Sequence, residues 1–268
     1  MTKMQKKNIS KAFKNIYIYL VFLFLYLPIF YVIIFSFNTS KLNIVFESFT
    51  VQWYGTFFKN RTLMEALMNT LIIGVVSTVV STIIGTIGAI GLNKYRFRGR
   101  GIIDKLLYIP IVIPEVVLGI ALLSIYSALS IPLGLVSLIL SHITFSIPFV
   151  VITVRARLAG FDKYLEEAAM DLGANRIVTF WRVTLPLIMP GVLSGAMLAF
   201  SLSIDDVIIS FFTSGPGSTT LPLKIFSMVK TGVTPEVNAL STVIMLITIV
   251  IIVVNTSFQV KKLKAVKA

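Results

Sequence analysis

The sequence predicts an all-α integral membrane protein with six transmembrane helices. Of its 268 residues, 56% are hydrophobic and 13% are charged, and the mean hydropathy is +0.93. Long apolar runs alternate with shorter polar segments, and about 20 helical residues are enough to cross the hydrocarbon of a bilayer. Because these runs are continuously apolar rather than alternating, they indicate helices and not the strands of a barrel.

The spans are oriented by their basic flanks. We expect the six spans at Asn15–Phe37, Leu67–Leu92, Leu106–Leu129, Ile131–Val154, Leu187–Ile208 and Val237–Phe258. Nineteen of the 24 Lys and Arg residues lie in the segments 1–14, 93–105, 155–186 and 261–268. Positive charge favours the cytoplasmic side, so both termini are expected inside and the loop 38–66 outside. The net charge of +13 is therefore a topology signal, and nucleic acid is not an expected partner.

The first span follows the basic segment 1–14 and imitates a signal peptide. Its apolar run is longer than the 7–15 residues usual for a signal-peptide core, and no small-x-small cleavage site follows it. We expect an uncleaved transmembrane helix. Cysteine is absent, which excludes disulfides and thiolate metal sites.

The polar loop 155–186 carries a short amphipathic helix, expected over residues 162–172. Its apolar stripe comprises Tyr164, Leu165, Ala168, Ala169 and Leu172, and three acids, Glu166, Glu167 and Asp171, lie off that stripe. An anionic leaflet would repel acids by about 1 kcal/mol per charge. A groove on another protein is therefore the expected binding site, and a helix lying on the lipid surface is the alternative.

Capping residues predict a second short helix in the same loop. Asp162 is placed to cap the first helix, and Gly173 is placed to end it. Asn175 is placed to cap the second helix. Pro186 is expected to break that helix where the fifth span begins.

Three carboxylates, Glu115, Asp205 and Asp206, lie within or at the edge of the apolar spans. A charge near mid-membrane costs about 2.5–3.5 kcal/mol on insertion scales, so each acid needs a partner, water or a ligand. We expect these acids to bind a cationic substrate on its path. Adjacent helical residues point about 100° apart, so at most one aspartate faces that path. Pairing of the aspartates with Lys224 or Lys230 is the alternative.

Small residues recur at every fourth position in two spans. They are Ser77, Ser81, Gly85 and Ala89 in the second span and Gly191, Gly195, Ala199 and Ser203 in the fifth. Such stripes allow close helix packing in lipid, which is the preferred interpretation for the second span. The fifth-span stripe has two alternatives, a substrate path or a subunit seam. The single histidine, His142, is expected to be a packed, hydrogen-bonded helix residue.

The loop 155–186 resembles a known family motif. Glu167-Ala168-Ala169, Gly173, Val183 and Leu185-Pro186 match the EAA motif of ABC importer permeases at every spacing. The resemblance implies the type I importer (MetI-like) permease fold over residues 66–257, followed by a basic cytoplasmic tail, 258–268. It also implies that the helix 162–172 couples the chain to an ABC ATPase. The residues implied in coupling are Glu166, Glu167, Ala168, Ala169, Asp171, Gly173 and Pro186.

Other segments resemble the PotC-type permeases of spermidine/putrescine importers. They are Tyr95–Gly99, Ser141–Val150, Ser203–Phe212, Gly215-Pro216, Leu221–Lys230 and Thr234–Ala239. The resemblance implies a polyamine substrate, an ABC ATPase dimer that binds ATP and Mg, a second homologous permease of the PotB type and an extracytoplasmic binding protein of the PotD type. It places the chain in a bacterial cytoplasmic membrane. The small, neutral stretch 217–220 departs from the pattern and leaves the contact with the binding protein open.

No Gly-x-x-x-x-Gly-Lys-Ser/Thr loop occurs in the chain, so ATP is not expected to bind by that route. We therefore expect no bound cofactor and no enzymatic activity in this subunit. Two alternatives stay open, which are a permease for another small solute and a proton-coupled secondary transporter whose acids relay protons.

Overall fold

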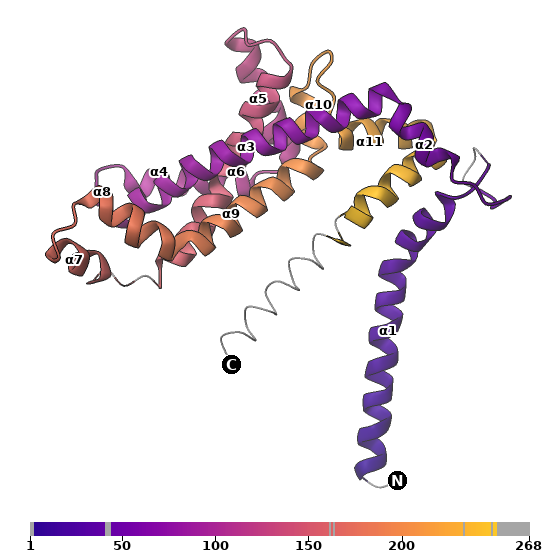
Figure 1. Cartoon of the computed structure of the whole chain (residues 1–268), viewed down its shortest axis with the longest axis horizontal. Helices are drawn as coiled ribbons and strands as arrows, with labels where there is room; N and C mark the ends of the chain where they lie inside the picture. Colours follow the sequence, from indigo (N-terminus) through magenta and orange to yellow (C-terminus); the bar gives the residue numbers. More distant parts are fainter. Residues whose placement is uncertain are drawn as a thin grey trace. The chain divides into compact units, whose positions relative to one another are not determined.

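A computed structural model describes residues 3–40, 44–160, 162, 164–232, 234–247 and 249–250. Helices dominate, and the predicted all-α class is confirmed (Figure 1). The described part holds one isolated β-bridge, which joins Asn38 and Phe49. The chain divides into two compact units, Met1–Met64 with Ser227–Ala268 and Glu65–Phe226, and each is described by itself.

Four helical segments of the described residues are long and apolar enough to cross a membrane. They are Lys14–Phe35 within α1 (Lys3–Phe35), α3 (Arg61–Lys94), α6 (Leu135–Leu158) and the continuous run Arg176–Asp205. A bent helix pair provides a fifth if it counts as one span. The sixth predicted span, Val237–Phe258, overlaps the shorter apolar helix Pro235–Ile247, and its residues 248 and 251–258 lie outside the described residues. The six-span count and the orientation of the termini stay predictions.

The unit made by the chain ends includes α1 and the short helix α2 (Gln52–Lys59). Helix α1 begins at Lys3, twelve residues before the predicted span Asn15–Phe37, because no Pro or Gly interrupts residues 3–14. The loop after it is held by Asn38, whose backbone carbonyl accepts a hydrogen bond from the indole of Trp53 at 2.7 Å. Tyr54 and Ser36 share a second bond at 2.7 Å between their hydroxyls.

The predicted span Leu106–Leu129 is not one straight helix, because the chain bends sharply inside it. Two helices, α4 (Arg100–Val112) and α5 (Glu115–Ala128), are bent by 113° relative to each other. Ile113 between them is extended, with φ −71° and ψ 135°. Pro114 accounts for the bend, since a residue before proline is excluded from the α region and proline donates no backbone hydrogen bond.

The predicted helix break at Pro186 is wrong. Helix α8 (Arg176–Thr179) continues through a π-helical turn, Phe180–Thr184, into α9 (Leu185–Asp205). The amide of Leu185 donates to the carbonyl of Phe180, five residues back. The wider π turn relieves the clash that a proline ring makes with the preceding turn of an α-helix. Pro186 thus sits in the first turn of α9, where its missing N–H is tolerated.

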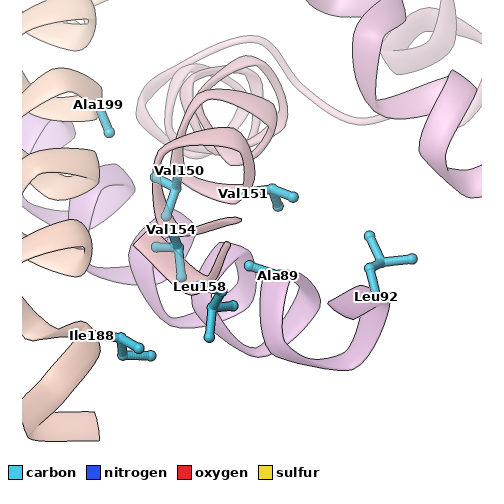
Figure 2. Packing of buried hydrophobic residues seen from close by; sticks show 8 residues of the cluster. All are labelled: Ala89, Leu92, Val150, Val151, Val154, Leu158, Ile188 and Ala199. Carbon is cyan, nitrogen blue, oxygen red and sulfur yellow. The ribbon is translucent and has the colours of Figure 1, made fainter. Parts of the chain in front are cut away.

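Helix α6 lies between α3 and α9 and forms the core with them. Its residues Val150, Val151, Val154 and Leu158 pack with Ala89 and Leu92 of α3 and with Ile188 and Ala199 of α9 (Figure 2). All eight are buried. This cluster is the apolar centre of the unit Glu65–Phe226.

Both small-residue stripes face α6. A Cβ on Gly85 would lie 2.7 Å from the Val150 side chain, and a Cβ on Gly195 would lie 3.3 Å from the Val150 Cα. A Cβ on Gly191 would lie 2.6 Å from the Cβ of Arg157. Helix packing within the chain therefore explains the second-span stripe as expected. It also explains the fifth-span stripe, for which a path or a subunit seam was the alternative.

Candidate functional sites

The three intramembrane acids line one cavity of about 390 Å³. Glu115 is the first residue of α5, Asp205 is the last residue of α9, and Asp206 follows in the break before α10 (Ile208–Thr213). The rest of the lining is mostly apolar and includes Pro110, Ile113, Leu118, Phe145, Phe149, Leu202 and Ile209. Ligand pockets commonly occupy about 300–1,000 Å³ and combine apolar walls with a few polar groups.

Two helix breaks bring these acids together. The α4–α5 bend at Pro114 places Glu115 at a helix start, and the α9 helix ends where Asp206 takes an extended conformation with ψ 127°. Helices α5 and α10, which follow the two breaks, pack against each other. Leu122 and Tyr126 of α5 and Ile209 of α10 are buried in one apolar cluster. Carboxylates about 90 residues apart in sequence thereby meet at one cavity.

The two adjacent aspartates differ in their surroundings. The Asp206 carboxylate is buried and accepts hydrogen bonds from the backbone amides of Ile209 at 3.1 Å and Ser210 at 2.7 Å. Asp205 and Glu115 are exposed. The expectation that the two aspartates point apart agrees with this geometry. Of the two, Asp205 has the side chain available to a ligand.

A buried polar chain holds Asp206 in place. His142 of α6 is fully buried, and its Nε2 lies 3.5 Å from Asp206 Oδ2. Its Nδ1 lies 2.6 Å from Ser203 Oγ, and its Nε2 lies 3.2 Å from Ser210 Oγ. Ser203 continues to Ser77 of α3 at 3.2 Å. The partners of Asp206 are thus an imidazole and two backbone amides, in place of the lysine that was the alternative.

The sequence contained no signal for this chain of contacts. His142 was expected to be a packed helix residue, and its burial confirms that expectation. Its partners Ser203 and Ser210 lie 61 and 68 positions away, and no local spacing links residues so far apart.

The second site is the loop around α7 (Tyr164–Asp171). Asp162 Oδ1 accepts a bond from the Tyr164 amide at 3.0 Å, and Asn175 Oδ1 accepts one from the Val178 amide at 2.9 Å. Gly173 has φ +90°, a left-handed conformation that glycine adopts without strain. The predicted caps and the predicted turn are confirmed, although α7 is shorter than the expected helix over 162–172.

Most of α7 is open to its surroundings. Glu167, Ala168 and Asp171 are exposed, and Ala169 is half-buried. Apolar residues are exposed too, with Leu172 at 90% and Tyr164 at 75%. Glu166 alone among the three acids turns inward, as its partners below show. An exposed helix with both apolar and acidic groups is suited to docking on another protein.

Several apolar helices long enough to cross a membrane, one bent helix pair and an exposed loop helix are typical of a multi-pass membrane protein. Residues 81–261 match the family described as the binding-protein-dependent transport system inner membrane component. The chain belongs to this family.

Relatives in the family cover most of the chain. The spermidine/putrescine transport system permease protein PotC of Escherichia coli (strain K12) is 41% identical over 235 residues, which span 88% of this chain and 89% of the relative. The putrescine transport system permease protein PotI of the same organism is 39% identical over 244 residues, 88% of this chain and 87% of the relative. PotC of Haemophilus influenzae is 40% identical over 242 residues, 90% of this chain and 94% of the relative.

Solved structures of ABC importers share the fold. A chain of a bacterial ABC transporter that imports alginate superposes with a TM-score of 0.73 at 18% identity, covering 97% of this chain and 98% of its own length. A chain of the MetNI methionine transporter superposes with a TM-score of 0.54 at 19% identity, covering 74% and 91%. These likenesses confirm the predicted type I importer permease fold.

Proposed function

We propose that the chain is the permease subunit of an ATP-driven importer of spermidine and putrescine. The names of the PotC and PotI relatives support this substrate class. The cavity that joins Glu115 and Asp205 carries the proposal, because its two exposed carboxylates match a substrate with several ammonium groups.

The cavity also has aromatic walls. Phe145 and Phe149 of α6 line it together with the acids. Aromatic faces attract ammonium groups by about 0.5–2 kcal/mol, with the larger value where water is excluded. The apolar lining would contact the methylene segments of a polyamine while the carboxylates bind its charged nitrogens. Asp206 would act indirectly in this scheme, by fixing the α9–α10 break.

The fold and the exposed α7 support the partners that we propose. An ABC ATPase dimer would bind the exposed face of α7 and hydrolyse ATP, with Glu167 and Asp171 toward it. A second permease of the PotB type would complete the path, and a binding protein of the PotD type would deliver substrate from outside. The complex would lie in a bacterial cytoplasmic membrane, with six spans and both termini inside.

Transport would proceed by alternating access. Closure of the ATPase dimer on ATP would move α7, and the two spans that it joins, α6 and α9, would tilt. The cavity would open to the outside, take up the polyamine and then release it inward. ATP can drive this cycle only by binding one state of the complex better than the other.

Uptake of radiolabelled spermidine by the reconstituted complex tests the cavity. Glu115→Gln and Asp205→Asn should each lower uptake by about tenfold or more, because an amide removes the charge that pairs with an ammonium group. Glu47→Gln, at an exposed acid in the loop 38–66, is the matched control and should leave uptake unchanged. Wild-type uptake in both cavity variants would show that Glu115 and Asp205 do not bind the substrate on its path.

A further inference from the structure

We propose that Glu166 is a positioning residue that transmits the movement of α7 to α3 and α9, and does not itself contact the ATPase. The inference rests on the proposed function, since it presupposes that α7 docks on that partner. It separates two acids that are neighbours in sequence. Glu167 belongs to the exposed docking face, whereas Glu166 belongs to the interior of the permease.

Both carboxylate oxygens of Glu166 have partners within the chain. Its Oε2 lies 2.5 Å from Nζ of Lys94, the last residue of α3. Its Oε1 accepts a hydrogen bond from the Thr184 hydroxyl at 2.6 Å. The Glu166 side chain is 13% exposed and that of Lys94 is 48% exposed. One side chain on α7 thus joins two elements that lie 72 residues before it and 18 residues after it.

The contact with Thr184 falls on an unusual piece of helix. Thr184 is buried and ends the π-helical turn that precedes α9. Such turns interrupt the regular ladder of helical bonds and occur often at functional sites. Since Glu166 holds this turn, a shift of α7 would act directly on the start of α9.

The two helices that Glu166 ties to α7 both pack on α6. Gly85 of α3 and Gly195 of α9 both lie against Val150, so both helices approach α6 closely at these glycines. The other end of α9 carries Asp205 at the acidic cavity. A single helix of 21 residues therefore runs from the Glu166 contact to the proposed substrate site.

The surroundings allow this ion pair to respond to a partner. A hollow of about 360 Å³ lies beside it and is lined by Asn93, Lys94, Tyr95, Glu166, Glu167 and Arg176. Solvent exposure of the lysine weakens the pair relative to a buried one. A pair of this kind holds α7 in position relative to α3 and still allows α7 to move.

A charge exchange tests the inference. In the reconstituted importer, Lys94→Glu and Glu166→Lys singly should each lower spermidine uptake per ATP hydrolysed by about fivefold or more, because each places like charges together. The double variant Lys94→Glu/Glu166→Lys should recover uptake per ATP to within about twofold of wild type. In all three, retention of the ATPase on the purified permease should equal that of wild type.

Glu167→Lys is the matched control. It should lower retention of the ATPase, and Lys94→Glu should not restore it. Retention lost in Glu166→Lys but kept in Glu167→Lys would overturn the inference and would leave the docking of α7 intact. Normal retention with no recovery in the double variant would overturn it as well. Absence of any ATPase on wild-type permease would overturn the proposed function together with the inference.

Charge reversal at a partly buried position can reduce folding. If either single variant fails to accumulate in the membrane, Glu166→Gln and Thr184→Val take its place, since they remove the ion pair or the hydroxyl bond without repulsion. Both should lower uptake per ATP with retention unchanged. Wild-type coupling in both would contradict the role of Glu166.

Discussion

The imidazole of His142 on α6 lies 3.5 Å from the carboxylate of Asp206, in the break that follows α9. Both groups are buried, and the serines at 203 and 210 bond the same imidazole. The contact ties the end of α9 and the start of α10 to α6. It thereby fixes one wall of the cavity that Glu115 and Asp205 line.

His142→Ala should destabilise the chain. The substitution removes the group that faces a buried carboxylate, and a buried polar group left without one of its partners typically costs about 1–3 kcal/mol. Thermal unfolding of the purified complex in detergent measures the effect as a lower Tm. His142→Gln keeps a polar side chain for the serines and should lower the Tm less. Equal Tm values for wild type and His142→Ala would show that this contact adds no stability.

The two adjacent aspartates should respond differently to the same change. Asp206→Asn removes charge from a buried carboxylate that accepts two amide bonds, and charged acceptors contribute about 1.5–3 kcal/mol. We expect a lower Tm for Asp206→Asn and an unchanged Tm with reduced uptake for Asp205→Asn. Thermal unfolding and uptake measured on the same preparations compare them. A lower Tm for Asp205→Asn alone would reverse the assignment.

Gly85→Ala should disturb the α3–α6 contact. Its added methyl group would lie 2.7 Å from Val150, and overpacking of this kind costs about 1–3 kcal/mol. Gly91→Ala on the same helix meets nothing within 4 Å and should be neutral or stabilising, because alanine favours helix more than glycine. Thermal unfolding of both variants checks the pair. An unchanged Tm for Gly85→Ala would mean that α3 and α6 can move apart at this position without loss of stability.

Gly173→Ala should weaken the coupling loop. At φ +90° an L-residue is strained by about 1–2 kcal/mol, so the turn after α7 would rearrange. ATP hydrolysis stimulated by substrate and binding protein should fall. Gly160→Ala, at a glycine with an open surround and no such φ, is the control and should hydrolyse ATP at the wild-type rate. Normal stimulated hydrolysis in Gly173→Ala would argue against a geometric role for this turn.

Local signals in the sequence predicted much of the fold. The apolar runs located the helices that are long enough to cross a membrane, and the caps at Asp162, Gly173 and Asn175 predicted the α7–α8 turn, because each cap acts within a few residues. Prolines were harder to interpret. The chain bends by 113° at Pro114, whereas a π turn accommodates Pro186 within a continuous helix. The outcome depends on tertiary packing, which the residues around a proline do not encode.

The candidate site was predictable as a set of residues and not as an arrangement. The cost of charge in lipid singled out Glu115, Asp205 and Asp206, and all three line one cavity. Their separate roles depend on His142, whose contacts to Asp206 span 64 positions. Likewise, Glu166 and Glu167 are neighbours in the sequence, and only the fold shows that Glu166 turns inward to Lys94 and Thr184.

We infer that this permease has no energy source of its own and takes it from an ATPase docked at α7. Spermidine accumulation in proteoliposomes should be measured with the chain alone, with both permeases, and with the full complex with and without ATP. We expect accumulation against a gradient only when the ATPase and ATP are both present. Accumulation by the chain alone, driven by a proton gradient and indifferent to ATP, would contradict it.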